Sequence, residues 1–255
     1  MNPGASGGPE AGSPDQYDRA RGGAERGERF ARMLDPLFAG RGPTLDVGAG
    51  TGMVACHLAA LGRPVLGVDR THDMLLVARR RMGDRVVLGD AERLPLRSGA
   101  VADAYSVWLL HLVDIPTVLR EVARILRPGG RYLVTATSDG RPGDHPVRGI
   151  TEEMSLRLRG GADRPDEPEN VAALAEGPFR TVGIVEGDTQ VFTTTPDEAA
   201  TLLERRIWFM VRRVDEATWD EVVAPAIAAL RALPDQHEVV RYEVRPRVLV
   251  LERRG

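Results

Sequence analysis

Three glycines occupy alternate positions in the stretch LDVGAGTGM, which spans residues 45–53. They are Gly48, Gly50 and Gly52, and Asp46 stands two residues before the first of them. Glycine tolerates unusual backbone angles, and its missing side chain lets a ligand approach the main chain. A helix that begins at such a bend presents unpaired N–H groups and the positive end of its dipole. The stretch therefore predicts a loop that holds a polar or anionic ligand closely.

The spacing of these glycines disfavours two common nucleotide-binding loops. The dinucleotide fingerprint G-x-G-x-x-G would need a glycine where this chain has Met53. The Walker loop needs a lysine, and all 34 basic residues of the chain are arginine. A nicotinamide dehydrogenase and a P-loop enzyme therefore do not fit the pattern.

The residues around this loop alternate between strand and helix patterns. Short apolar runs predict strands at residues 44–49, 63–69, 85–90, 100–110 and 131–138. Helical spacing predicts helices at residues 52–62, 72–82 and 115–126. This alternation predicts a parallel sheet with helices on both faces, whose ligands bind beyond the carboxyl ends of the strands. The glycine loop follows the first of these strands, where a ligand is expected.

The second half of the chain follows a less regular pattern. It predicts a loop at residues 139–149, a helix at 167–175, a long strand or bent ribbon at 179–195, helices at 196–214 and 215–233, and a final strand at 238–254. Helices placed between the last two strands are expected to cover the carboxyl edge of the sheet.

The composition is typical of a globular protein, and the net charge indicates no strong electrostatic attraction for a charged partner. Of the 255 residues, 42% are hydrophobic and 28% are charged, and the net charge is -3, so no overall basic field attracts a polyanion. The single cysteine, Cys56, allows no internal disulfide, and no apolar run approaches the ~20 residues of a membrane span. We therefore expect a cytoplasmic protein, monomeric or homodimeric, that binds neither nucleic acid nor membrane.

Five segments, in order along the chain, resemble the class I S-adenosylmethionine-dependent methyltransferases, most of all those acting on small molecules. LDVGAGTG resembles the first motif of the family, and VLGVDRTHDML resembles its second-strand segment. LGDAERLPL resembles the adenine-binding segment, AVADAYSVWLLHLVD the fourth-strand segment, and EVARILRPGGRYLVTA the helix, turn and fifth strand. Together they cover about residues 44–136. One glycine motif alone would indicate little, whereas five at family-like spacing indicate the family.

The resemblance implies an α/β fold of the Rossmann-like kind. Its sheet is expected to have seven mostly parallel strands with helices on both faces, an antiparallel last strand and a helical cap over the carboxyl edge. The implied divisions are a disordered leader at 1–16, an N-terminal lid helix at 17–42, a cofactor-binding core at 43–138, and a substrate-pocket or cap region at 139–255 that includes the last two strands.

The resemblance also implies S-adenosylmethionine as the cofactor. Asp69, at the tip of the second strand, offers a carboxylate that can accept hydrogen bonds from both ribose hydroxyls. Asp90 can accept one from the adenine amino group, and Tyr17 resembles a lid tyrosine over the cofactor. The full implied set is Tyr17, Asp46, Gly48, Ala49, Gly50, Thr51, Gly52, Asp69, Arg70, Met74, Asp90, Ala91, Glu92 and Val107, with Leu94 beside the purine. Structural alternatives stay open, since Asp46 can simply brace the loop and the other acids can be ordinary strand-end residues.

Methyl transfer needs a general base only when the acceptor carries a proton of high pKa. His111 is the candidate base because it follows the fourth strand, although packing or hydrogen bonding would also explain a histidine there. The acceptor is expected to contact Tyr17, Trp108, His111, His145 and Trp208. The alternative for the residues around Trp208 is plain helix core, and the arginines at 79–81 are expected on a solvated helix face.

Metal assistance and nucleic-acid methylation are disfavoured. The segment VWLLH after the fourth strand supplies no acid for a metal and no Asn-Pro-Pro-aromatic run for adenine methylation. We predict methyl transfer to a small molecule. The use of arginine in place of lysine throughout is typical of high-GC bacteria, in which such enzymes often act on secondary metabolites, so these are the associated acceptor class. The O-, N- or C-methylation is left open. The alternatives are a cofactor-binding protein without methyl transfer, such as a cyclase or a regulator, and a methyltransferase for RNA or protein.

Overall fold

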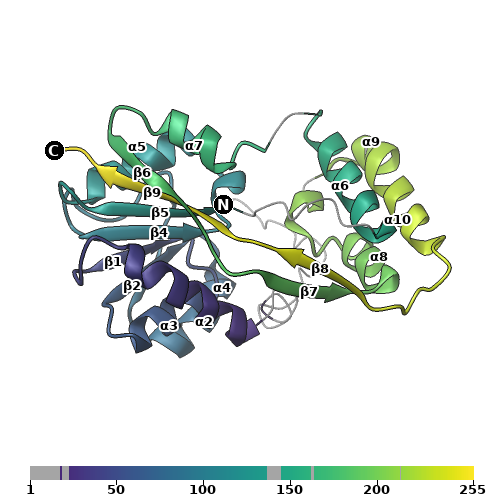
Figure 1. Ribbon diagram of the computed structural model, residues 1–255, viewed down its shortest axis with the longest axis horizontal. Coiled ribbons are helices and arrows are strands. Elements are labelled where there is room, and N and C mark those ends of the chain that lie inside the picture. Colours follow the sequence, from purple (N-terminus) through teal and green to yellow (C-terminus); the bar gives the residue numbers. More distant parts are fainter. Residues whose placement is uncertain (1–17, 19–22, 137–144, 162–163, 213) are drawn as a thin grey trace, which may run out of the picture. The chain divides into compact units, whose positions relative to one another are not determined.

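The computed structural model describes residues 18, 23–136, 145–161, 164–212 and 214–255 (Figure 1). The chain divides into two compact units. The sheet unit comprises residues 14–138, 164–189 and 245–255, and the helical unit comprises residues 1–13, 139–163 and 190–244. The predicted leader at 1–16 and the predicted lid residue Tyr17 lie outside the described residues.

A seven-stranded sheet forms the centre of the sheet unit, in the order β3-β2-β1-β4-β5-β9-β6. The strands are β1 (Thr44–Val47), β2 (Val65–Asp69), β3 (Val86–Leu88), β4 (Asp103–Val107), β5 (Arg131–Ala136), β6 (Phe179–Glu186) and β9 (Arg247–Arg253). Strands β1 to β5 are parallel, and β9 is antiparallel to both β5 and β6. The predicted sheet, with its antiparallel last strand, is confirmed. The strand order reverses between β1 and β4, which places the expected ligand crevice there.

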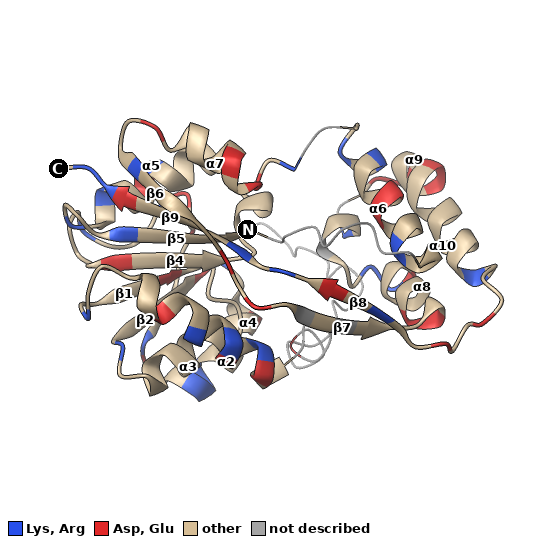
Figure 2. Cartoon of the chain, in the orientation of Figure 1, with Lys and Arg blue, Asp and Glu red and all other residues tan. Residues whose placement is uncertain are grey.

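Helices cover both faces of this sheet. They are α2 (Gly23–Leu34), α3 (Met53–Ala60), α4 (His72–Met82), α5 (Ile115–Ile125) and α7 (Pro168–Leu174). Helices α5 and α7 pack on one face, and α2, α3 and α4 pack on the other. The apolar residues of α5 are buried and recur at helical spacing, so the stripe seen in the sequence is the side that meets the sheet. Charged residues lie mostly on the helices and at the strand ends (Figure 2).

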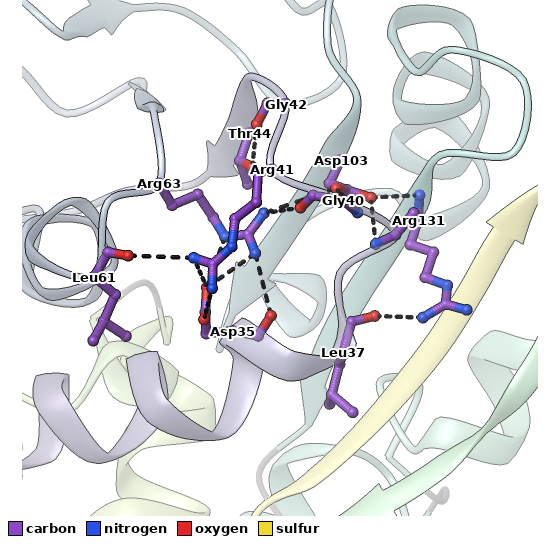
Figure 3. A network of polar contacts seen from close by, with 11 residues as sticks. Asp35, Leu37, Gly40, Arg41, Gly42, Thr44, Leu61, Arg63, Asp103 and Arg131 are labelled. Carbon is purple, nitrogen blue, oxygen red and sulfur yellow. Dashed lines mark hydrogen bonds and ion pairs between the residues drawn. The ribbon is translucent and has the colours of Figure 1, made fainter.

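A network of polar contacts lies at the edge of the sheet where β1, β4 and β5 begin (Figure 3). The Arg63 side chain is only 2% exposed; its Nε lies 3.0 Å from Asp35 Oδ1, and its Nη1 donates to Gly40 O at 2.6 Å. Asp103 Oδ1 accepts hydrogen bonds from the backbone N–H groups of Ala39 and Arg131. The network ties the segment after α2 to the first residues of the strands.

The segment predicted as a long strand or bent ribbon at 179–195 and the final strand predicted at 238–254 are both interrupted. The first divides into β6 and β7 (Gln190–Thr194), and the second into β8 (Val240–Val244) and β9, with β7 and β8 paired in a separate two-stranded sheet. Gly187 N donates to Pro246 O at 2.8 Å, so the two breaks lie side by side. Pro246 has no N–H for a sheet ladder, which explains why a single final strand was a wrong prediction.

The helical unit holds the β7–β8 ribbon and a small core of its own. Its helices are α6 (Pro146–Leu158), α8 (Pro196–Glu204), α9 (Glu216–Thr218) and α10 (Ala224–Arg231), with short turns η3 (Phe209–Val211) and η4 (Trp219–Val223). The helix predicted at 196–214 ends early because Arg206 takes a left-handed φ of 50°. The loop predicted at 139–149 is wrong at its end, since Pro146 opens α6, a favoured position for proline. In the described part of the chain, no helix is both long and apolar enough to cross a membrane.

Candidate functional site

The glycine loop joins the end of β1 to the start of α3. Its three glycines have positive φ values, 75° at Gly48, 54° at Gly50 and 71° at Gly52, a region that other residues rarely adopt. A Cβ at Gly48 would lie 2.7 Å from a Leu109 carbon, whereas a Cβ at Gly50 would meet no heavy atom within 4 Å. Glycine is therefore favoured at position 48 by its positive φ, with the Leu109 side chain close to where a Cβ would lie, and the backbone at position 50 faces open space.

Asp69 braces this loop from the end of β2. Its Oδ2 accepts a hydrogen bond from Gly50 N at 2.8 Å, and its Oδ1 accepts one from Thr71 N at 2.8 Å. Each carboxylate oxygen has two acceptor sites, so these bonds leave capacity for hydroxyl donors of a ligand. Bracing of the glycine loop, the alternative role given for Asp46, is thus performed by Asp69, which can also bind a ligand.

A shallow pocket that is open to solvent lies over the loop. It is lined by Asp18, Gly23, Arg26, Gly27, Asp46, Gly48, Ala49, Gly50, Thr51, Met53, Val54, Val107 and Trp108. Six of the residues predicted for the cofactor and one predicted for the acceptor, Trp108, therefore share one pocket. The buried Gly52 is outside its lining, as are Asp69, Arg70, Met74, Asp90, Ala91 and Glu92.

The predicted adenine residues lie one strand further along the same edge. Gly89 N donates to Asp69 O at 3.0 Å, so the chain brings Asp90 next to the end of β2. Asp90 is exposed, and its Oδ1 accepts a hydrogen bond from Glu92 N at 2.9 Å. Ala91 is buried, Arg70 is exposed and Met74 is half-buried. The structure brings these residues to neighbouring strand ends but encloses no pocket around them.

Asp46 is the most perturbed acid of the pocket. It is only 4% exposed, and its Oδ2 accepts a hydrogen bond from the Tyr105 hydroxyl at 2.7 Å. Burial raises the pKa of Asp46 to about 7, although the Tyr105 bond lowers it, and the charge of Asp69 raises it further. Sequence reasoning missed Tyr105. The signal was available only through the register that places Tyr105 opposite Asp46 on β4.

Arg26 was also missed, and it stacks on a strained tryptophan. Its guanidinium carbon lies 3.3 Å from the centre of the Trp108 ring, and Phe30 meets that ring edge-on at 5.9 Å. Trp108 has a φ of 57°, an uncommon conformation for a bulky residue and one that clusters at functional sites. No motif in the sequence pointed to Arg26, because its contact with Trp108 is made only by the fold.

A second missed group links the N-terminal segment to the glycine loop. Thr51 Oγ1 donates to Asp18 Oδ1 at 2.6 Å, and Asp18 Oδ2 lies 2.8 Å from an Arg81 nitrogen. Arg81 also donates to Thr51 O at 2.8 Å. The prediction of a solvated face for the three arginines is wrong for Arg81, whereas Arg79 and Arg80 are exposed.

His111 lies in the turn η2 (Leu110–Leu112), outside the lining of the pocket. Its Nδ1 is 3.4 Å from Asp166 Oδ2, and both side chains are largely buried. Burial raises the pKa of Asp166, but hydrogen bonds with His111 and Arg164 outweigh it and bring the value to about 2. Asp166 was not found from the sequence, because the two residues meet only through the fold.

The remaining two predicted acceptor residues belong to the helical unit. His145 is the residue before α6, and its Nδ1 accepts a hydrogen bond from Val147 N at 3.3 Å. Trp208 packs against the core of the helical unit, in agreement with the plain-core alternative. In the described residues, no group of three or more His, Cys, Asp or Glu side chains could hold a metal ion.

The chain is similar in sequence to known methyltransferases. Residues 45–134 match the family model of a methyltransferase domain. An uncharacterised methyltransferase from Mycobacterium tuberculosis is 43% identical over 101 residues, which are 39% of this chain and 42% of that relative. A demethylmenaquinone methyltransferase from Mycobacterium sp. is 30% identical over 199 residues, 76% of each chain. The chain thus spans less than half of the first relative and about three quarters of the second.

Solved structures share the fold at low sequence identity. The cyclase SpnF has a TM-score of 0.57 at 18% identity, covering 97% of this chain and 99% of that one. A geranyl diphosphate C-methyltransferase from Streptomyces coelicolor, solved with S-adenosyl-L-homocysteine, has a TM-score of 0.53 at 17% identity, covering 88% and 75%. These likenesses concern the fold alone.

Proposed function

The chain belongs to the S-adenosylmethionine-dependent methyltransferases, and we propose that it transfers the methyl group of that cofactor to a small-molecule acceptor. The observation that carries the proposal is the pocket at the switch point, where the glycine loop, Asp46 and Arg26 meet. The demethylmenaquinone methyltransferase from Mycobacterium sp., whose name indicates a small-molecule acceptor, supports it over 76% of the chain.

The charges of the pocket fit the amino-acid end of the cofactor. That end carries an ammonium and a carboxylate, and the pocket is lined by two acids, Asp46 and Asp18, and one guanidinium, Arg26. Asp18 already pairs with Thr51 and Arg81, so Asp46 is the acid left for an ammonium. Asp46 would accept from the ammonium, and Arg26 would bind the carboxylate. The open space at Gly50 leaves its backbone accessible at the same end.

The strand ends beyond the pocket fit the adenosine end. Asp69 would accept hydrogen bonds from the ribose hydroxyls while it continues to brace Gly50. Asp90 and Ala91 would pair with the adenine ring, with Arg70 and Met74 beside it. These residues follow one another along the ends of β2 and β3, as an extended nucleoside requires.

When bound, S-adenosylmethionine supplies a methyl group on a sulfonium, so the protein contributes mainly binding and alignment. Holding the acceptor in line with the departing sulfur removes several kcal/mol of entropic barrier, with the range reaching about 7–11 kcal/mol for well-oriented reactants. Trp108, in its strained conformation at the end of β4, supplies a rigid aromatic wall for that alignment.

His111 is proposed as the general base when the methylated group of the small molecule carries a proton. The Asp166 carboxylate on Nδ1 would hold the ring in one tautomer and direct the Nε2 lone pair toward the acceptor. We expect His111→Ala and Asp166→Asn to keep cofactor affinity and to lower turnover. Unchanged turnover in both variants would leave His111 with a packing role.

The transfer itself is tested with methyl-labelled cofactor and a panel of small molecules. Secondary metabolites are the first acceptor class to include, because the composition indicates a high-GC host. Labelled product together with S-adenosylhomocysteine would support the proposal. Cofactor binding without S-adenosylhomocysteine across the panel would favour a cyclase-like or regulatory protein, and label found only in RNA or protein would favour the remaining alternative.

A further inference from the structure

We propose that Tyr105 is a positioning residue that sets the charge and orientation of Asp46, so that the pocket selects ligands by their α-ammonium group. This inference rests on the proposed cofactor site. It assigns a role to a buried tyrosine that lies in the fourth-strand segment but does not line the pocket.

The geometry holds Asp46 and Tyr105 as a fixed pair. They are opposite each other in the register between β1 and β4, both are buried, and the phenol donates to Asp46 Oδ2 at 2.7 Å. The Tyr105 ring meets Phe38 edge-on at 5.9 Å, which restrains its position. The acid therefore cannot rotate away from the pocket without losing the hydrogen bond from the Tyr105 hydroxyl.

The pair leaves the acid with unused binding capacity toward the pocket. In the described residues, the only hydrogen bond recorded for the Asp46 side chain is the one from Tyr105. A buried carboxylate without a cation is costly, and a ligand ammonium in the pocket would compensate it. The titratable and charged groups around the pair are Asp69, Asp18, Arg26, Cys56, Arg63 and Tyr132.

Binding of a cation at Asp46 must be linked to its ionisation. The protonated acid predominates below about pH 7, where it offers no charge to an ammonium. S-adenosylmethionine and S-adenosylhomocysteine carry the ammonium, whereas 5′-methylthioadenosine keeps the adenosine and lacks the amino-acid part. Affinity for the first two should therefore rise with pH, and affinity for the third should not.

The Tyr105 hydroxyl stabilises the ionised acid, because a hydroxyl donor favours the charged form of a carboxylate. Without it, ionisation of Asp46 moves to higher pH. The loss of ammonium binding in Tyr105→Phe should then be larger at pH 7 than at pH 8. A loss of packing alone would weaken all three ligands to the same extent at every pH.

Calorimetric titrations of the full chain with S-adenosylhomocysteine and 5′-methylthioadenosine at pH 6, 7 and 8 test this. In the wild-type protein, S-adenosylhomocysteine should bind roughly tenfold more tightly at pH 8 than at pH 6. The affinity for 5′-methylthioadenosine should stay constant. Tyr105→Phe should weaken S-adenosylhomocysteine binding at pH 7 by roughly tenfold and leave 5′-methylthioadenosine binding unchanged.

Two further variants separate charge from packing. Asp46→Asn keeps the shape and an acceptor for the phenol, so it should fold, bind S-adenosylhomocysteine weakly and show no pH dependence. Tyr132→Phe is the matched control, because that buried hydroxyl bonds Ser106 Oγ at 2.9 Å rather than Asp46. Its affinities and pH profile should equal those of the wild type.

The outcomes distinguish this inference from the proposed function. Equal weakening of both ligands in Tyr105→Phe, or a wild-type pH profile in Asp46→Asn, would overturn the inference and leave the cofactor site in place. Absence of binding by any of the adenosyl ligands to the folded wild-type chain would overturn the proposed function itself.

Discussion

Charged side chains at the two ends of the strands of the seven-stranded sheet, the edge where the strands begin and the edge where they end, differ in how many protein partners they have. At the edge where the strands begin, Arg63 is surrounded by Asp35, Asp103 and backbone carbonyls, and its guanidinium lies over the Phe38 ring at 4.1 Å. At the edge where the strands end, the described residues give Asp46 one hydrogen-bond donor, the Tyr105 hydroxyl. Arg63 and Asp103 are satisfied by protein partners at the first edge, whereas Asp46 keeps acceptor capacity at the second.

The backbone differs in the same sense. Trp108 adopts a positive φ at the carboxyl edge, a conformation that a bulky residue keeps only where the surrounding structure enforces it. At the opposite edge, positive φ values such as those of Gly99 and Gly129 belong to glycine, which adopts them without strain. Saturated charges stabilise the fold, whereas strained backbone and undercompensated acids are features that a ligand can use. The comparison predicts that substitutions at the first edge change stability, and that substitutions at the second change cofactor affinity.

The largest effect is expected at Arg63. Arg63→Met removes the cation of a buried network and leaves the buried Asp103 and the half-buried Asp35 without it, at a cost of about 3–5 kcal/mol in unfolding free energy. Chemical denaturation measures this loss, and calorimetry on the folded protein should find unchanged S-adenosylhomocysteine affinity. Arg41→Met is the control, because Arg41 pairs with the same Asp35 while 64% exposed and should cost at most about 1 kcal/mol. Equal costs in the two variants would contradict the contrast between the edges.

Gly48→Ala should follow, with a cost of about 2–4 kcal/mol shared between stability and cofactor affinity. The added Cβ would be strained at a φ of 75° and would crowd Leu109 at 2.7 Å. Gly62→Ala is the control, since Gly62 has a φ of 83° and no neighbour within 4 Å. It should lose some thermal stability and keep the wild-type affinity. A loss of affinity in the control would show that backbone strain anywhere disturbs the site.

Asp69→Ala should weaken cofactor binding by roughly 1.5–3 kcal/mol, the range of a charge-assisted hydrogen bond. Part of this loss would come from the released glycine loop, because Asp69 also accepts from Gly50 N. Asp73→Ala is the matched control. Asp73 is also an acid near the end of β2, but its side chain is 82% exposed. That control should bind normally, and unchanged affinity in folded Asp69→Ala would remove Asp69 from the site.

The smallest effect concerns the pH dependence of the ligand-free protein. Burial holds the pKa of Asp46 near 7 in the folded chain, above the value of 3.8 for an ordinary aspartate, so the protonated acid favours folding. That stability is fully present below about pH 4 and is lost as pH rises through 7. Between pH 6 and 8 the wild type should lose on the order of 1–2 kcal/mol more than Asp46→Asn. Thermal unfolding at the two pH values measures the difference, and parallel curves would contradict it.

Local pattern was sufficient for most of the first half of the chain. The alternation of apolar strands and amphipathic helices between residues 44 and 136 predicted β1 to β5 and the helices between them, because each element carries its own periodicity. The later elements were harder, since a strand interrupted by Pro246 and a helix ended by Arg206 depend on partners far along the chain. Asp166 and Tyr105 escaped prediction for the same reason.

The sequence by itself determined the family, the parallel core and the glycine loop, because these depend on residue type and short-range spacing. Only the tertiary structure decided which groups meet: Asp46 with Tyr105, Arg26 with Trp108, and His111 with Asp166. The physical reason is that register and packing, rather than sequence distance, bring side chains within hydrogen-bond range. The ionisation of Asp46 then follows from the burial and neighbours that the fold provides.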